Sequence, residues 1–473
     1  MDLAYLSATE ALALFRAREL SPVELMRAVI DRAEKTEPVV NAFAERLFEE
    51  ALAQARDAQD RYLGKGGQEP RPLEGIPVAT KEKHAIAGRL LTEGSLVYRD
   101  TVATENAPVI DRILAAGGII HARTTTPEFS CAYFTHTRLW GVTRNPWHTD
   151  FTPGGSSGGS AAALAAGSTV LASGSDIAGS TRVPAAFTGT VGFKAPYGRI
   201  PGAPPLAADF YRGDGPLART VADCAAFTNA LTGPDPRDHT SLRPAVTLPG
   251  AYEPAAGMRL ALCLRLGDYP VSAEVETATR AAATALADAG ATVEEIELPW
   301  RMSEIRATVA THFSQIFGAI IAEIARDHRD QLMPYSLAFA DQMAAAARRL
   351  SFLEALRTET RMQRELATAM APFDALICPT TTVPGLPAGD DLLAADGDDT
   401  VLGKAETATM TVPFNICNRC PVLAVPSGHA ANGLPLGIQI VGHTYDDATV
   451  FRVGAALEQA RPWAYTPTHR PSL

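Results

Sequence analysis

Two glycine- and serine-rich segments of this 473-residue chain carry side chains suited to nucleophilic catalysis. The first, residues 154–160, reads GGSSGGS and contains Ser156 and Ser157. The second, residues 175–182, reads SDIAGSTR and contains Ser180. A serine hydroxyl is a poor nucleophile until a neighbouring base accepts its proton. The pattern therefore indicates serine-dependent attack on a carbonyl, provided that the fold supplies a base.

Lys81 is the candidate for that base. Histidine is the usual partner of a catalytic serine, but four histidines lack an obvious acidic partner: His84, which lies in a basic context, His121, His136 and His148. Lys81 follows the apolar run GIPVAT, and a strand there would deliver it into the interior. Burial lowers a lysine pKa and leaves a neutral amine that can act as a base. The Ser–Lys variant of the catalytic triad is therefore predicted.

The turn before Ser180 is predicted to supply an oxyanion hole. It follows an apolar strand, and a tight turn there brings several backbone N–H groups to face one point: those of Ile177, Ala178, Gly179 and Ser180. Such donors stabilise the charge of a tetrahedral intermediate. The loss of one donor typically costs about 100- to 1000-fold in rate.

These motifs resemble the signature of the amidase signature family, whose members use a Ser–cis-Ser–Lys triad. The likeness is carried, with matching spacing, by GGSSGGSAAALAAG (154–167), SDIAGSTRVPAAFTGTVGFKAPYGRI (175–200) and the lysine motif GIPVATKEKHAIAG (75–88). It continues through residues 19–43, 215–227 and 433–442, and so spans nearly the whole chain except about 245–370. The resemblance implies that Ser180 is the nucleophile, that Ser156 relays its proton, and that Lys81 is the terminal base.

Further residues are assigned through the same resemblance. Asp176 and Arg182 match supporting residues of the family, although a plain structural ion pair explains them equally well, and Ser157 is placed with them. The resemblance implies no metal and no organic cofactor. The chain also departs from the family pattern. Lys81-Glu82-Lys83 stands where members commonly have Lys-Asp-Asn, and Ala178 stands where a glycine is usual.

The elements around the motifs alternate between short apolar runs and helical stretches, at 75–80, 107–118, 119–124, 160–168 and 169–176. This alternation predicts βαβ units, and hence an α/β fold with a mixed, mostly parallel central sheet covered by helices on both faces. We expect a single domain over residues 1–473. Its predicted parts are N-terminal helices (1–62), a catalytic signature core (70–235), a variable helical specificity insertion (about 245–370) and a return to the sheet (374–473).

Composition restricts the classes of partner and compartment. The net charge of −11 argues against nucleic acid or an anionic membrane, because both reward a basic face. No stretch reaches the roughly 18 apolar residues that a membrane span needs, and the N-terminus does not read as a cleaved signal. Six cysteines in so long a chain do not suggest a disulfide scaffold, so a reducing cytoplasm is expected. A monomer or homodimer is expected.

Substrate specificity is expected to lie in residues 126–136, 199–215 and 301–372, which contain many aromatic side chains. The candidate substrate-binding residues are Phe129, Ser130, Cys131, Tyr133 and Arg199, with Arg212 as a second cation of the mobile loop. An apolar or aromatic acyl or amine group would suit them. The favoured function is hydrolysis of small-molecule amides, with esters and carbamates (urethanes) as further candidates, through an acyl-enzyme.

Three alternative functions are open at this point. The chain also fits the amidase-type subunit of a tRNA-dependent amidotransferase, which needs partner subunits. An α/β-hydrolase esterase would use the G-x-S-x-G pattern around Ser156 or Ser157, but no convincing acid-then-histidine order follows. A binding protein on an inactive scaffold would not need an intact triad. The pair Cys417-x-x-Cys420 is a poor zinc site because no second pair accompanies it.

Overall fold

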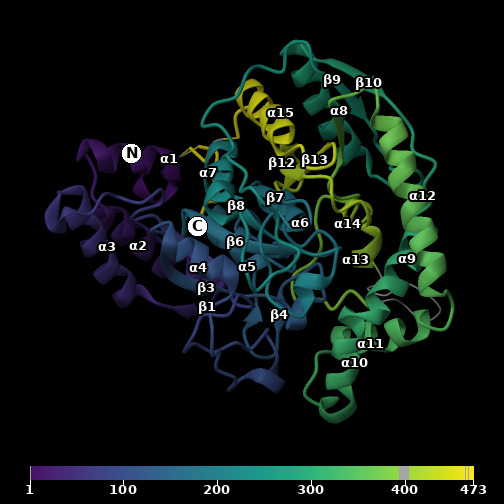
Figure 1. Ribbon diagram of the computed structural model, residues 1–473, viewed down its shortest axis with the longest axis horizontal. Helices are drawn as coiled ribbons and strands as arrows, with labels where there is room; N and C mark the ends of the chain where they lie inside the picture. Colours follow the sequence, from purple (N-terminus) through teal and green to yellow (C-terminus); the bar gives the residue numbers. More distant parts are fainter. Residues whose placement is uncertain (1, 394–403, 464, 467) are drawn as a thin grey trace.

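A computed structural model describes residues 2–393, 404–463, 465–466 and 468–473 (Figure 1). Within these residues, eleven strands form one sheet in the order β1-β3-β2-β6-β8-β7-β12-β13-β11-β9-β10. The bounds are β1 (Phe43–Arg46), β2 (Pro77–Lys81), β3 (Ile119–Thr124), β6 (Leu171–Asp176), β7 (Val191–Lys194), β8 (Gly213–Ala218), β9 (Arg259–Leu262), β10 (Thr292–Glu295), β11 (Ala375–Pro379), β12 (Val422–His429) and β13 (Pro435–Gly442). Strands β4 (His136–Thr137) and β5 (Gly141–Val142) pair separately.

The predicted α/β fold with a mixed central sheet is confirmed. Parallel pairing runs from β3 through β2 to β6, and from β11 through β9 to β10. The strands between these groups pair in antiparallel fashion. The expectation of mostly parallel pairing therefore holds for these two groups but not for the centre. There, β12 and β13 form a hairpin, and a short turn can join only antiparallel neighbours.

The N-terminal part consists of α1 (Ala8–Ala17), α2 (Pro22–Val40) and α3 (Phe48–Tyr62). Helix α2 begins after Ser21, as a serine followed by proline and then Glu24 predicts. The Ser21 hydroxyl accepts from the N–H of Glu24, and the Glu24 carboxylate accepts from the N–H of Ser21. This reciprocal cap satisfies two N–H groups that a helix terminus otherwise leaves without partners.

The core helices are α4 (Pro108–Ala115), α5 (Gly158–Ala166), α6 (Arg182–Thr188) and α7 (Val221–Leu231). Helix α5 is buried along its whole length, which its small side chains permit. At Gly159 a Cβ atom would lie 2.4 Å from Thr125 Oγ1 and 2.7 Å from the carbonyl oxygen of Ala42. The helix therefore packs closely against its neighbours and holds the preceding serine-rich loop in place.

The remaining helices flank the strands of the second half of the chain and the C-terminus. They are α8 (Ala273–Asp288), α9 (Met302–Gln315), α10 (Phe317–His328), α11 (Pro334–Ala346), α12 (Phe352–Met370), α13 (Lys404–Thr407), α14 (Pro413–Ile416) and α15 (Asp447–Ala460). Short 3-10 helices occupy Leu3–Tyr5, Lys65–Gly67, Leu96–Tyr98, Glu128–Ser130 and Leu206–Ala208. Helices α9–α12 form the green group beside the core in Figure 1.

Two parallel neighbours of the sheet bring the sequence motifs together. Strand β2 ends at Lys81, and β6 ends at Asp176, four residues before Ser180. Because β2 and β6 run in the same direction, their carboxyl ends lie at the same edge of the sheet. Ligands of open α/β sheets bind at such an edge. The N-terminus of α5 adds Ser156 and Ser157 there.

Candidate active site

The Lys81 amine is fully buried among serine hydroxyls. Its Nζ atom lies 2.6 Å from Ser156 Oγ, 3.0 Å from Ser175 Oγ and 3.2 Å from Ser157 Oγ. Burial lowers the pKa of Lys81 well below its usual value, and the nearby charge of Lys83 lowers it further. A neutral lysine amine donates two hydrogen bonds and accepts one, which matches three hydroxyl neighbours. The site therefore suits an uncharged amine that accepts a proton from Ser156.

The loop before α5 joins the two serine-rich segments. The N–H of Ser157 donates to the carbonyl oxygen of Ser180 at 3.1 Å, and the N–H of Ser175 donates to Ser157 Oγ at 3.2 Å. The peptide bond between Gly155 and Ser156 is cis. A Cβ atom on Gly155 would lie 2.3 Å from the carbonyl oxygen of Phe134. Glycine is thus required where this loop passes the 129–134 segment.

Asp176 organises the turn that carries Ser180. Its carboxylate accepts from the N–H groups of Gly179 and Thr181 at 2.8 and 3.2 Å, and from Arg182 and Asn415. Burial alone would raise the pKa of Asp176, but the Arg182 guanidinium and these hydrogen bonds outweigh it and lower the pKa to about 2. The carboxylate is therefore charged across the range in which proteins function.

Arg182 links this turn to the last part of the chain. Its Nη1 donates to the carbonyl oxygen of Thr411 at 2.8 Å and to Gln439 Oε1 at 2.6 Å, and its Nη2 donates to Asn415 Oδ1 at 2.7 Å. With the two bonds to Asp176, all five guanidinium N–H donors are used. The predicted pairing of Asp176 with Arg182 is present as part of a larger buried network.

The predicted oxyanion donors differ in their availability. The Gly179 N–H donates to Asp176, so in this structure it is not directed at a substrate. The carbonyl oxygen of Ala178 accepts from the Thr411 and Tyr133 hydroxyls, which fixes the orientation of the peptide. Gly179 has φ +126°, and a Cβ atom there would lie 2.0 Å from Thr411 Oγ1. The geometry leaves Ile177, Ala178 and Ser180 as the candidate donors.

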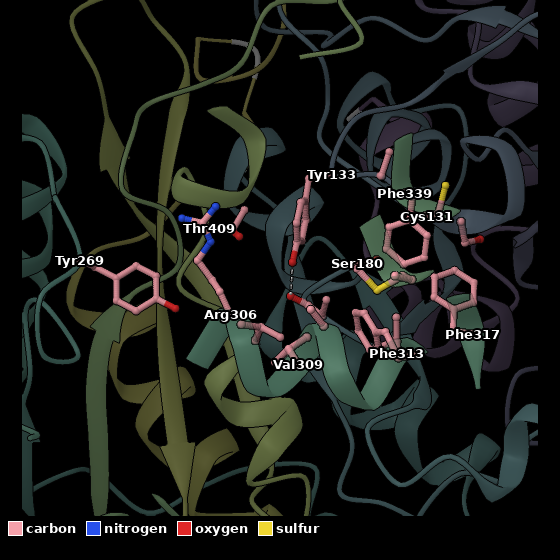
Figure 2. A pocket seen from close by; sticks show the side chains of 17 residues that line it. Cys131, Tyr133, Ser180, Tyr269, Arg306, Val309, Phe313, Phe317, Phe339 and Thr409 are labelled. Carbon is pink, nitrogen blue, oxygen red and sulfur yellow. Dashed lines mark hydrogen bonds between the residues drawn. The ribbon is translucent and has the colours of Figure 1, made fainter. Parts of the chain in front are cut away.

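Two cavities meet at Ser180. The narrow one has a volume of about 60 Å³ and is mostly apolar. Figure 2 shows Phe313, Phe317 and Phe339 grouped on one side of Ser180, with Tyr269 and Arg306 on the other. The wide one has a volume of about 570 Å³ and a more polar wall. Ser156 lines the wide cavity and Ala178 the narrow one.

Four of the five predicted substrate-binding residues line these cavities. Phe129 lines the wide cavity, Cys131 and Tyr133 line the narrow one, and Ser130 lines both. Burial raises the pKa of Cys131 to about 12, which fits a wall residue and not a nucleophile. Arg199 is the exception.

Arg199 does not line either cavity. Its guanidinium donates to Asp447 Oδ2 at 2.8 and 3.1 Å and lies over the ring of Tyr445. Asp447 begins α15, which is far from Arg199 in the sequence and adjacent to it in the fold. The prediction of substrate binding by Arg199 is therefore not supported by its position. Arg212, the second cation of the same loop, does line the wide cavity.

A buried histidine beside the lysine was not identified from the sequence. His84 Nδ1 lies 2.9 Å from Ser173 Oγ, which also accepts from the N–H of Lys81 at 3.1 Å. His84 Nε2 lies 3.2 Å from Asp214 Oδ1. Burial lowers the pKa of His84, which favours the neutral ring. The acidic partner comes from β8, a neighbour of β6 only in the folded sheet, so no local signal pointed to it.

Other features of the sequence have structural explanations. Cys417 is buried and Cys420 is half-buried, and all six cysteines are free. The carbonyl oxygen of Cys420 accepts from the buried Lys194 at 2.9 Å. Among the described residues, no single helix is long and apolar enough to cross a membrane, although α9 and α10, bent by 57°, reach that length and composition together.

Comparisons with known proteins agree with this site. A sequence model of the family described as Amidase matches residues 24–451. A subunit of the glutamyl-tRNA(Gln) amidotransferase of Thermosynechococcus vestitus is 34% identical, over 94% of this chain and 96% of the relative. A bacterial aryl acylamidase of the amidase signature family has a similar crystal structure, with a TM-score of 0.87 and 27% identity over 97% of each chain. A 6-aminohexanoate cyclic dimer hydrolase gives a TM-score of 0.85 and 28% identity, over 100% of this chain and 99% of its own.

Family, fold and the lysine–serine geometry thus agree over nearly the whole length of the chain. The chain belongs to the amidase signature family of serine amidohydrolases, enzymes that act on C–N amide bonds.

Proposed function

We propose that this protein hydrolyses small-molecule amides through an acyl-enzyme on Ser180. The observation that carries the proposal is the 2.6 Å contact between the buried Lys81 Nζ and Ser156 Oγ, at the edge of the cavity that Ser180 also lines. Neutral Lys81 accepts a proton from Ser156 while Ser156 accepts one from Ser180. The Ser180 oxygen then attacks the amide carbon, and N–H groups of the 177–180 turn stabilise the oxyanion.

The second half of the reaction uses the same groups in reverse. The proton held by Lys81 returns through Ser156 to the amine that leaves when the C–N bond breaks. Water then attacks the acyl-enzyme and regenerates Ser180. Because Ser156 lines the wide cavity, the departing amine belongs there. The acyl group then occupies the narrow apolar cavity beside the oxyanion turn.

The cavity volumes support a small acyl group. A cavity needs roughly 10–15 Å³ of this volume for each water-sized occupant. The narrow cavity, at about 60 Å³, therefore suits a short acyl group of a few heavy atoms. Phe313, Phe317 and Phe339 would contact that group. Aryl amides and carbamates with a small acyl half are the substrates that we favour, with esters as side substrates.

The second candidate function is that of an amidotransferase component. It is favoured by the full-length similarity to subunits of glutamyl-tRNA(Gln) amidotransferases. The similarity in fold to an aryl acylamidase and to a 6-aminohexanoate cyclic dimer hydrolase favours independent hydrolysis. We propose a monomer or homodimer in the reducing cytoplasm, in keeping with the six free cysteines.

A test on the purified chain alone separates the two functions. We expect steady release of aniline from acetanilides and of amine from simple carbamates, without any partner protein. A fluorophosphonate should block this activity and add its mass to the peptide that contains Ser180. An inert isolated chain that gains activity only with partner subunits would favour the amidotransferase. Labelling of another residue would contradict the assignment of Ser180.

A further inference from the structure

The wall of the wide cavity carries two cations that the proposed reaction does not use. Lys83 and Arg212 both line this cavity, beside His84 and Asp214. Lys83 is partly exposed to the cavity, and Arg212 is more than nine-tenths buried. Lys83 is also one of the positions at which this chain departs from the common family motif.

The available carboxylates do not satisfy these cations. Asp214 Oδ1 accepts from Arg212 Nη2 at 3.0 Å and faces His84 Nε2 at 3.2 Å. Among the described residues, the Lys83 ammonium has no hydrogen-bond or ion-pair partner, and the buried Arg212 Nε has no hydrogen-bond partner. Glu93 attracts Lys83 through space but does not reach ion-pair distance within the described chain. Two donor positions are therefore open on one wall.

A buried donor without an acceptor costs free energy, because it has lost its hydrogen bonds to water. A carboxylate supplies two acceptor oxygens and one negative charge. It would pair with the Lys83 ammonium and with Arg212 Nε in a single contact. Hydrogen bonds of this kind, between charged partners, are about twice as strong as neutral ones.

We propose that the wide cavity binds amides whose amine half carries a carboxylate, held by Lys83 and Arg212. The substrate class is then N-acyl amino carboxylates, such as N-acylated aminobenzoates, with a short acyl group in the narrow cavity. This inference rests on the proposed function, because Ser156 assigns the amine half to the wide cavity. It extends that function by naming the charged group that the amine half bears.

The charge state of Lys83 provides an independent signature. Burial lowers the pKa of Lys83 to about 8, with Arg212 lowering it and Asp214 and Glu93 opposing the shift. Below pH 8 the ammonium is charged and attracts a carboxylate; above pH 8 the free enzyme loses that charge. The advantage of an acidic substrate over a neutral one should therefore decline as the pH rises through about 8.

The test compares three acetanilides that differ in one substituent: 4-acetamidobenzoate, neutral 4-methylacetanilide and cationic 4-acetamidobenzylamine, with 3-acetamidobenzoate as a second position for the acid. The measured quantity is the ratio of kcat/KM for each acid to kcat/KM for the neutral compound. Comparing this ratio between variants removes the intrinsic effect of the substituent on reactivity.

We expect Lys83→Met to lower the ratio about 10- to 100-fold, as for the loss of a charged hydrogen bond. Lys83→Arg should keep the ratio high above pH 8, because arginine stays charged. Lys65→Met is the matched control, since Lys65 is an exposed lysine paired with Asp60 outside both cavities. Its ratio should equal that of the unaltered chain.

The outcomes separate this inference from the proposed function. If no acetanilide is hydrolysed, the proposed function fails. If all are hydrolysed but the ratio is the same in Lys83→Met and Lys65→Met for both acids, only the carboxylate site is wrong. A preference for the cationic compound would also overturn it and would identify Glu93 as the recognition group.

Discussion

Two buried lysines of this protein lie in opposite chemical surroundings. Lys81 faces the hydroxyls of Ser156, Ser157 and Ser175, whereas Lys194 donates to Asn418 Oδ1 and to the carbonyl oxygen of Cys420. Burial lowers both pKa values, that of Lys194 to about 7. Hydroxyls can give up a proton to a neutral amine, but carbonyl oxygens cannot. Burial alone therefore does not make a base; the neighbouring groups decide.

The largest effect is expected from Ser180, where the chain of hydroxyls ends. Ser180→Ala removes the attacking oxygen, and we expect kcat for 4-methylacetanilide to fall about 10⁴-fold or more. Initial rates and fluorophosphonate labelling measure the loss, and an unchanged melting temperature would show that the fold is intact. A fully active Ser180→Ala protein would end the serine mechanism.

The two lysines can be compared directly by the same substitution. Lys81→Met should lower kcat about 10³- to 10⁴-fold, at the upper end of the range for loss of a general base. Lys194→Met should stay within about tenfold of the unaltered rate and should act mainly on the melting temperature. Equal losses in the two variants would contradict the distinction between base and structural lysine.

The pH profile sharpens the comparison further. A base must be uncharged to act, so kcat/KM should rise with pH and level off above the pKa of Lys81, well below the ~10.4 of a free lysine. Lys83 lowers that pKa, so Lys83→Met should move the rising limb to higher pH. Lys194→Met should leave the limb in place. A limb that does not respond to Lys83→Met would indicate another titrating group.

The smallest effect concerns one hydroxyl of the lysine site. Ser175→Ala removes an acceptor at 3.0 Å from Lys81 Nζ, and we expect kcat to fall about 5- to 15-fold, the value of one hydrogen bond. Ser160→Ala is the control, because the Ser160 hydroxyl donates to the carbonyl oxygen of Ser173 and does not reach Lys81. Rates that fall equally in both variants would mean that packing, and not the contact with Lys81, is responsible.

The parts of the site that could be predicted from sequence are those that local patterns determine. The apolar run before Lys81 implied a strand, and burial of that strand places the lysine inside. The glycine- and serine-rich segments implied tight loops, and both occur at the same edge of the sheet. The α/β fold followed from the alternation of strands and helices.

The parts that could not be predicted depend on partners distant in the chain. His84 was set aside for want of an acid, which Asp214 supplies from β8. Arg199 was assigned to the substrate because nothing in its own segment indicated Asp447. The central antiparallel pairing likewise depends on which strands become neighbours. Periodicity and spacing carry no information about such pairs.

The network around Arg182 has a consequence for biosynthesis. Three of its acceptors come from Thr411, Asn415 and Gln439, so a ribosome-bound chain that ends before them already contains Lys81, Ser156 and Ser180 but lacks what fixes the Ser180 turn. Nascent fragments therefore carry the reactive groups without their scaffold. Hydrolytic competence arrives only with the last strands to be synthesised.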